Sequence, residues 1–254
     1  MSLAPSRRFS RRADHYARFR PGYPDAVLAY LAAECGLERS SRVADVGSGT
    51  GLLARMFLEF GCTVYGIEPN REMRDAGETA LAGMKNFISV DGFAERSTLP
   101  DASVDLVIAG QAFHWFDHAL ARTEFRRILR GRARIALLWN YRRPDASAFM
   151  RGYEALLRRY CPEYPQLLDP ERHRGEVIAF FSGGKVSEFS LDNRQTLDFE
   201  ALEGRHLSQS YVPLEGESFE PMMRELRAIY DAHQRNGSIA VDYETRMYCG
   251  SLSG

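Results

Sequence analysis

A glycine-rich segment near residue 47 carries the clearest chemistry in this sequence. Gly47, Gly49 and Gly51 directly follow the apolar run 43–46. Glycines tolerate positive φ angles and let a ligand approach the backbone closely. A helix that starts at such a turn has free N–H groups at its first residues, which suit a polar or anionic ligand. We therefore expect a nucleotide-like ligand at the end of this strand.

An acidic residue stands where a second contact to such a ligand is needed. Glu68 ends the next apolar run, 17 residues after Gly51, close to where a carboxylate binds ribose hydroxyls in nucleotide-binding α/β folds. These features alone do not distinguish a dinucleotide from another adenosine-containing ligand. The dinucleotide pattern G-x-G-x-x-G would, however, require glycine or alanine at Leu52. Asp45 also places a carboxylate in the strand, where burial is costly unless the group is paired.

The elements that must position these residues follow an alternating order. Short apolar runs alternate with amphipathic stretches, and this order is typical of βαβ units with a mostly parallel sheet. The five strands expected in this part are 42–47, 62–68, 87–92, 103–110 and 132–140. Two helices, 10–20 and 24–35, are expected before them, because the prolines and glycine of 20–24 break a continuous helix.

The second half of the chain has a looser pattern. Residues 145–180 are expected to be helical, and 185–199 and 238–250 alternate like two strands that pair antiparallel. Residues 200–236 between them look helical, with an interruption at 211–216. We expect one domain over 1–254, which consists of an N-terminal helical cap (1–40), a ligand-binding core (41–140) and a C-terminal part (141–254).

The composition excludes several classes of protein. The formal net charge of −1 over 254 residues argues against a nucleic-acid or anionic-membrane partner. No apolar run approaches the roughly 20 residues of a membrane span, so a cytoplasmic protein is expected. The four cysteines, Cys35, Cys62, Cys161 and Cys249, are far apart, and this spacing predicts neither a disulfide framework nor a metal site.

Several segments closely resemble the class I S-adenosylmethionine-dependent methyltransferases of the small-molecule "type 11" branch, which includes trans-aconitate methyltransferase-like proteins. The segments are 13–24, Asp45–Gly51, Gly66–Met73, 99–107 and Ala112–Asp117. The resemblance implies an α/β, Rossmann-like fold. Its sheet would be mostly parallel and seven-stranded with an antiparallel last strand, with helices on both faces and an N-terminal helical cap. It also implies S-adenosyl-L-methionine as the cofactor and a small-molecule methyl acceptor.

The resemblance also implies a set of cofactor-binding residues. Asp45 and the glycine loop would hold the methionine end, Glu68 the ribose hydroxyls, and Met73 would pack on the adenine. Many relatives carry an aspartate before the Ala-Glu pair where this chain has Phe93, which leaves Asp91, Glu95 or backbone groups as candidates for the adenine amino group. The full set is Tyr16, Arg20, Asp45, Gly47, Ser48, Gly49, Thr50, Gly51, Glu68, Pro69, Met73, Phe93, Ala94, Glu95, Gln111, His114 and Trp115.

The acceptor side is less defined. A methyl group on a sulfonium is already activated, so positioning supplies most of the catalysis, and a general base is needed only for some acceptors. His114 is the candidate base, although a structural or cofactor-wall role is favoured at this turn. Arg205 and Tyr211 are candidate substrate residues on a helix above the strand ends, and an arginine there favours a carboxylic acid.

Three other functions remain open on the sequence alone. A nucleic-acid methyltransferase would use the same cofactor. An NAD(P)-dependent oxidoreductase would share the glycine loop and the acidic residue. A cofactor-binding protein without turnover would share all of these features.

Overall fold

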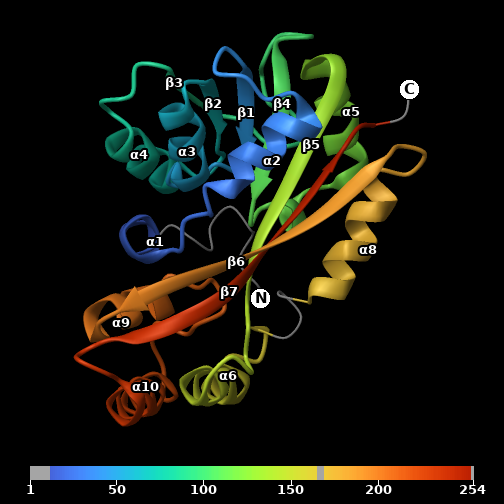
Figure 1. Cartoon of the computed structure of the whole chain (residues 1–254). Helices are drawn as coiled ribbons and strands as arrows, with labels where there is room; N and C mark the ends of the chain where they lie inside the picture. Colours follow the sequence, from blue (N-terminus) through green and yellow to red (C-terminus); the bar gives the residue numbers. More distant parts are fainter. Residues whose placement is uncertain (1–11, 165–168, 253–254) are drawn as a thin grey trace.

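The computed structural model of this chain describes residues 12–164 and 169–252. Seven strands form one sheet in the order β3-β2-β1-β4-β5-β7-β6 (Figure 1). The strands are β1 Arg42–Val46, β2 Thr63–Ile67, β3 Phe87–Val90, β4 Val104–Gly110, β5 Leu129–Arg142, β6 Val186–Leu197 and β7 Ile239–Gly250. The five expected strands of the first half and the two of the second half are all present.

Strand direction follows the expected pattern. β1 pairs in parallel with both β2 and β4, β2 with β3, and β4 with β5. β7 runs antiparallel to β5 and to β6. The chain order reverses beside β1, and a reversal of this kind in an open sheet leaves a crevice at the carboxyl ends of the strands. The α/β fold with a mostly parallel seven-stranded sheet and an antiparallel last strand is confirmed.

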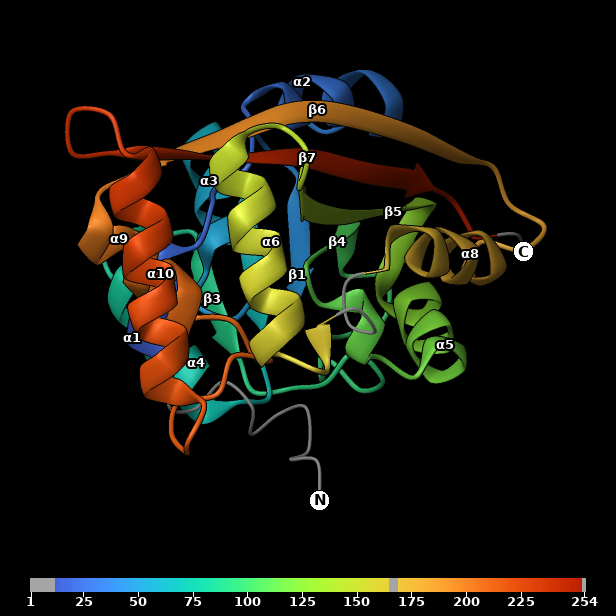
Figure 2. The same cartoon turned by 90° about the horizontal axis from the view of Figure 1, so that it is seen from below.

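Helices cover both faces of the sheet (Figures 1 and 2). On one face, buried side chains of α2 and α3 pack with those of β1, β2 and β4. On the other face, α5 and α8 supply apolar side chains such as Phe125 and Phe180. The helices are α1 Ala13–Phe19, α2 Ala26–Cys35, α3 Leu52–Phe60, α4 Arg71–Ala80, α5 His118–Ile128, α6 Ala148–Tyr160, α8 Pro170–Phe180, α9 Phe199–Leu207 and α10 Phe219–His233, with a 3-10 turn, η3, at Phe113–Trp115.

A third apolar core lies beside the sheet, where β6 and β7 extend past the parallel strands (Figure 1). It is built from α6, α9, α10 and the β7 residues Ile239, Val241 and Tyr243. These helices fall in the regions 145–180 and 200–236 that the sequence predicted to be helical. α1 packs against α9 and α4, so the described part of the N-terminal cap bridges the sheet core and this third core.

The cysteine prediction was wrong in one respect. Cys35 at the end of α2 and Cys249 in β7 form a disulfide. Their separation of 214 residues gives no local signal, and only the packing of α2 against β7 brings them together. Cys62 and Cys161 are free and buried.

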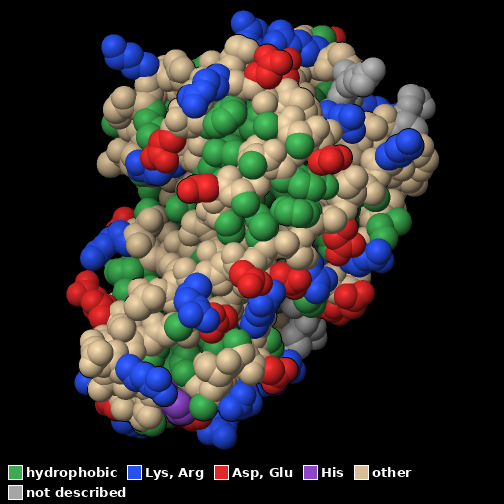
Figure 3. Space-filling view, viewed as in Figure 1, with side chains coloured by type: hydrophobic (Ala, Val, Ile, Leu, Met, Phe, Trp, Pro, Cys, Tyr) green, Lys and Arg blue, Asp and Glu red, His purple; other side chains and the backbone are tan. Residues whose placement is uncertain are grey.

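Charged side chains of both signs lie interspersed on the face seen in Figure 3. Within 12–164 and 169–252, no helix combines the length and the apolar character needed to cross a membrane.

Candidate functional site

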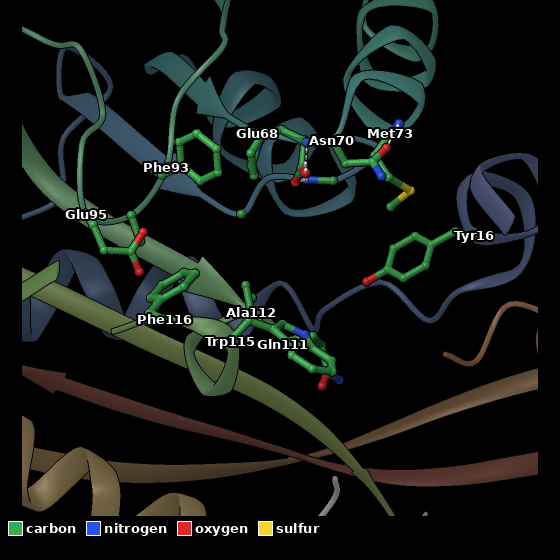
Figure 4. A pocket seen from close by; sticks show the side chains of 15 residues that line it. Tyr16, Glu68, Asn70, Met73, Phe93, Glu95, Gln111, Ala112, Trp115 and Phe116 are labelled. Carbon is green, nitrogen blue, oxygen red and sulfur yellow. Dashed lines mark hydrogen bonds between the residues drawn. The ribbon is translucent and has the colours of Figure 1, made fainter. Parts of the chain in front are cut away.

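A pocket opens where β1, β2 and β4 end, and its volume is about 260 Å³. Figure 4 shows Phe93, Glu68, Asn70 and Met73 along one wall. Glu95, Phe116, Ala112, Trp115 and Gln111 lie along the opposite wall, and Tyr16 from α1 stands at one end (Figure 4). Gly47, Gly49, Pro69, Ala94 and Gly110 complete the lining. Segments far apart in the sequence therefore meet at the crevice that the strand order creates.

The glycine loop needs glycine for both conformation and space. Gly47, Gly49 and Gly51 all have positive φ angles, of 69°, 55° and 78°. A Cβ at Gly47 would lie 2.6 Å from the Cβ of Ala112, a distance that real Cβ atoms do not adopt. The loop can therefore lie directly against the segment that follows β4 only because it carries no side chain at this position.

The N–H groups of the glycine loop are already hydrogen-bonded within the chain, whereas the sequence led us to expect free donors. Gly47 and Ser48 donate to the Ile67 carbonyl, Gly49 donates to Glu68, and Gly51 donates to the Ser48 carbonyl. The loop thus folds back on the end of β2, and these four donors hold its shape. Glycine serves here for close approach more than for exposure of N–H groups.

Glu68 is buried, with 8% of its surface exposed. Its Oε2 accepts a hydrogen bond from the Gly49 N–H at 2.9 Å, and its Oε1 accepts one from the Asn70 N–H at 2.8 Å. Burial raises the pKa of this carboxyl, while the two backbone donors and Arg74 lower it. Each carboxylate oxygen has two lone pairs, so Glu68 retains acceptor capacity on the pocket side.

Asp45 lies beneath the loop, with 1% of its surface exposed, and it does not line the pocket. Neither of its carboxylate oxygens has a hydrogen-bond partner of good geometry, although the Ala54 N–H lies close enough to lower the pKa of the carboxyl. Burial and the nearby Glu68 carboxylate outweigh that effect and raise the pKa of Asp45 to about 7. The buried hydroxyl of Thr50 also lacks a partner. A buried carboxylate without a partner is unfavourable, so Asp45 favours a positive charge on the pocket side of the loop.

The far end of the pocket has an apolar wall. Phe93 is 46% exposed although it is a large apolar side chain, and it faces the pocket (Figure 4). Glu95 lines the pocket, and its Oε1 also accepts from the Asp117 N–H at 2.7 Å. Asp91 does not line the pocket and forms an ion pair with Arg74 at 3.1 Å. Of the two acidic candidates for an adenine contact, Glu95 is the one at the pocket.

Comparisons with known proteins decide the family. A family model described as a methyltransferase domain matches residues 44–137. An uncharacterised methyltransferase of Geobacillus thermodenitrificans is 30% identical over 189 residues, which cover 71% of this chain and 83% of that protein. The chain belongs to the methyltransferase family.

Further relatives agree with this assignment. An uncharacterised methyltransferase of Mycobacterium tuberculosis is 39% identical over 127 residues, or 50% of this chain. The chain spans about half the length of the mycobacterial relatives it matches, 49%. A solved structure from Anaeromyxobacter dehalogenans, named for a type II methyltransferase, superposes with a TM-score of 0.67 and 25% identity over 93% of this chain and 100% of that one. Membership of the methyltransferase family favours a methyl donor over a dinucleotide as the ligand of this pocket.

His114 lies behind the pocket wall rather than in the lining. Trp139 Nε1 donates to His114 Nδ1 at 3.5 Å. The His114 ring stacks on the His173 ring, with 5.1 Å between the two centroids. Burial is the main cause that lowers the pKa of His114 to about 3, and the neighbouring His173 and Arg172 contribute to the same shift. A neutral, weakly basic imidazole in an aromatic stack favours the structural role over general-base catalysis.

The predicted residues of the N-terminal helix lie at the pocket. Tyr16 lines it, and the Arg20 guanidinium lies over the Tyr16 ring at 4.5 Å from the centroid. Arg20 itself stands behind Tyr16 and donates to the Ser208 carbonyl at 3.1 Å. α1 therefore brings one lining residue to the pocket, and Arg20, which follows the helix, places a half-buried cation against that residue.

Arg205 and Tyr211, the predicted substrate residues, do not line this pocket. Arg205 is 4% exposed and donates to the Tyr243 hydroxyl. Tyr211 accepts from Arg142 at 3.0 Å. The two residues belong to a polar cluster that includes Arg142 at the end of β5 and Tyr243 of β7.

Sequence reasoning missed four lining residues, which are Asn70, Gly110, Ala112 and Phe116. Asn70 had a readable signal, because it precedes α4 and caps it through a bond from the Met73 N–H. Gln111, which was in the predicted set, has a positive φ of 59°. A non-glycine residue in this region is uncommon and clusters at functional sites.

Proposed function

We propose that this methyltransferase transfers a methyl group from S-adenosyl-L-methionine to a small-molecule carboxylic acid, as members of the trans-aconitate methyltransferase-like branch would. The observation that carries the proposal is the pairing of a shaped pocket with unsatisfied buried groups beneath its loop. Asp45 and Thr50 have no hydrogen-bond partner, and the uncompensated carboxylate of Asp45 favours a ligand that brings an ammonium and a sulfonium group to the pocket side of the loop.

The lining residues divide the cofactor between them in this proposal. Glu68 would accept the ribose hydroxyls with its remaining lone pairs. Phe93 and Met73 would enclose the adenine, and Asp45 would offset the positive charge of the methionine end across the glycine loop. Burying the Phe93 surface on adenine would contribute on the order of 1 kcal/mol or more.

The chain's own residues would then position an acceptor that is already ionised. When bound, S-adenosyl-L-methionine supplies a methyl group activated by its sulfonium, so a nucleophilic acceptor oxygen displaces the thioether in line without a proton transfer. His114 has a pKa of about 3 because of burial, so it is a weak base. A carboxylic acid, with an ordinary pKa near 4, is ionised at neutral pH and needs no base.

Charge supports the same acceptor class. Arg205 is a buried cation near Arg20, and the guanidinium of Arg20 lies over the ring of the lining residue Tyr16. A guanidinium in a closed site binds carboxylates through paired, charge-assisted hydrogen bonds.

A transfer assay with methyl-labelled S-adenosyl-L-methionine and a panel of small mono-, di- and tricarboxylic acids tests this proposal. The expected product is a methyl ester, which mild base hydrolyses with release of labelled methanol. The Glu68→Gln variant serves as the control for cofactor-dependent labelling. Base-stable label in an amine, a thioether or RNA, with none in the acids, would contradict the proposal.

A further inference from the structure

Three arginines gather behind Tyr16, and they come from three distant parts of the chain. Arg20 follows α1, Arg142 ends β5, and Arg205 lies in α9. We call them the arginine cluster. Arg20 contacts the ring of Tyr16, which lines the pocket, so the cluster begins directly behind the pocket wall.

The hydrogen-bond partners of the Arg142 guanidinium among the described residues are neutral. It donates to Gln209 Oε1 at 2.7 Å and to the Tyr211 hydroxyl at 3.0 Å. The Tyr153 and Tyr164 rings lie 5.7 Å and 5.0 Å from its guanidinium carbon. Aromatic faces stabilise a cation, yet they do not neutralise it.

Arg205 and Arg20, like Arg142, donate hydrogen bonds to neutral groups. Arg205 Nε donates to the Tyr243 hydroxyl at 3.1 Å, and Arg20 donates to the Ser208 carbonyl at 3.1 Å. Burial lowers the pKa of Arg20, and the positive charge of Arg205 lowers it further. The two cations are therefore close enough to repel each other.

No carboxylate of the described residues forms an ion pair with any member of the cluster. Each member also keeps one buried nitrogen without a hydrogen-bond partner, namely Arg20 Nε, Arg142 Nε and Arg205 Nη1. Arg205 is buried, while Arg20 and Arg142 are half-buried. Cations that are partly withdrawn from water and bonded only to neutral groups are unfavourable, so the arginine cluster is suited to anions that come from outside the described residues.

The cofactor accounts for one of these cations. The carboxylate of S-adenosyl-L-methionine would lie near Tyr16, and Arg20 behind that ring is the member within reach. Arg142 and Arg205 then remain without an anion. Methylation would turn the reacting carboxylate of the acceptor into a neutral ester, so that group is not a lasting partner for two guanidinium groups.

We propose that Arg142 and Arg205 form an anion subsite that binds a second, non-reacting carboxylate or phosphate of the acceptor. This inference rests on the proposed function and narrows its substrate class to small organic acids with two separated anionic groups. Tyr211 and Tyr243 orient the two guanidinium groups through the bonds described above.

The register of β4 and β5 locates the subsite relative to the pocket. Leu138 of β5 pairs with Gly110, which lines the pocket, and Arg142 lies four residues further along the same strand. At about 3.3 Å per residue the two points are about 13 Å apart along the strand. An arginine side chain spans part of this distance, so the proposed second anion would lie beyond Gly110 in the direction of β5.

The test is calorimetric titration of the full chain with glutarate, its monomethyl ester and inorganic phosphate, with and without saturating S-adenosylhomocysteine. Glutarate should bind more tightly than chloride at equal ionic strength. Arg142→Gln and Arg205→Gln should each weaken glutarate about tenfold or more, the usual effect of losing a hydrogen bond to a charged group. If phosphate binds more tightly than glutarate, and the same variants lose this affinity, the acceptor would be a phosphorylated acid.

The matched control is Arg143→Gln. Arg143 is adjacent in sequence, but its guanidinium pairs with Asp192 at 2.7 Å on the surface, so this variant should bind glutarate as the parent does. Arg142→Lys keeps the charge without the planar fork, and it should also lose affinity. This variant keeps the test valid if Arg142→Gln does not fold.

The outcomes separate the two proposals. Any of three results would overturn the subsite. They are an unchanged anion affinity in Arg142→Gln and Arg205→Gln, a loss of affinity in Arg143→Gln as large as in those variants, and no anion binding to the parent. S-adenosylhomocysteine should bind all variants equally. If it fails to bind the parent while the anion response persists, the proposed function fails and the anion subsite stands.

Discussion

Glu68 at the end of β2 accepts a hydrogen bond from the backbone N–H of Gly49 at 2.9 Å. The bond joins the two features that the sequence placed at the same ligand, the acidic residue and the glycine loop. It also gives Glu68 a structural task, since the same carboxylate accepts from Asn70. Loop shape and ligand binding therefore depend on one side chain.

Glu68→Gln tests this dual role. The amide has one acceptor oxygen where the carboxylate has two, so either the loop or the ribose loses a bond. S-adenosylhomocysteine should bind about 1 to 3 kcal/mol more weakly by calorimetry, with a small fall in melting temperature. Glu59→Gln, at an exposed site of α3, should change neither quantity. Unaltered affinity at an intact melting temperature would remove Glu68 from the cofactor site.

Gly47→Ala should be far more harmful than Gly36→Ala. Both glycines have positive φ, 69° and 66°, so both variants carry a left-handed conformation that costs about 1 to 2 kcal/mol. Only at Gly47 does the new methyl group meet another atom, the Ala112 Cβ at 2.6 Å, and overpacking adds about 1 to 3 kcal/mol. Denaturant titration measures the difference, and equal losses of stability would show that the loop can move aside.

Binding of S-adenosyl-L-methionine should release a proton near neutral pH. Burial raises the pKa of Asp45 to about 7, so the free protein is partly protonated there at pH 6.5, and a cationic ligand favours the ionised form. Affinity should therefore rise as the pH increases from about 6 to 8. Titrations at pH 6.5 in two buffers of different ionisation enthalpy measure the proton release, which Asp45→Asn should abolish.

The same carboxyl has a consequence for stability. Its pKa is higher in the folded chain than its ordinary value of 3.8, so protonation favours the folded state at low pH. That contribution is lost as the pH rises from about 4 through 7. Asp45→Asn should thus stabilise the cofactor-free protein at pH 8 and have little effect at pH 4. A destabilised variant at pH 8 would show that Asp45 has a partner in the free chain.

Buried neutral histidines should make the fold sensitive to acid. His206 is fully buried and hydrogen-bonded to the Tyr153 hydroxyl at 3.1 Å. Burial is the main cause that lowers its pKa to about 3, and the positive charge of Arg142 contributes to the same shift. Because the unfolded chain binds the proton more readily, stability falls as the pH drops below about 6.5, by about 2 kcal/mol at pH 5 for this residue.

His206→Gln isolates that contribution. The variant should lose less stability than the parent between pH 7 and pH 5, as measured by urea denaturation at each pH. The two proteins should differ by a constant amount above pH 7. Parallel curves down to pH 5 would mean that His206 is not the group responsible.

The glycine loop and Glu68 could be predicted because short stretches of sequence specify them. The apolar run 43–46 and the three glycines specify a strand, a tight turn and a helix without reference to the rest of the chain. The end of the second strand placed Glu68 in the same way. Parallel pairing of β1 with β2 then brings these carboxyl ends together.

The rest of the site depended on packing that no local pattern encodes. The sequence predicted a strand over 132–140, whereas β5 continues to Arg142, and those two residues carry the strand to the arginine cluster. His114 looked like a base because its type and position suit one. Its neighbours Trp139 and His173 come from β5 and α8, and burial, more than any single neighbour, lowers its pKa.

The account depends most on the pocket being a site for S-adenosyl-L-methionine, and one titration tests this directly. The purified chain is titrated calorimetrically with S-adenosylhomocysteine and, in parallel, with NAD. The account predicts one S-adenosylhomocysteine bound per chain, an affinity reduced in Glu68→Gln, and no heat from NAD. Saturable binding of NAD with no response to S-adenosylhomocysteine would contradict it.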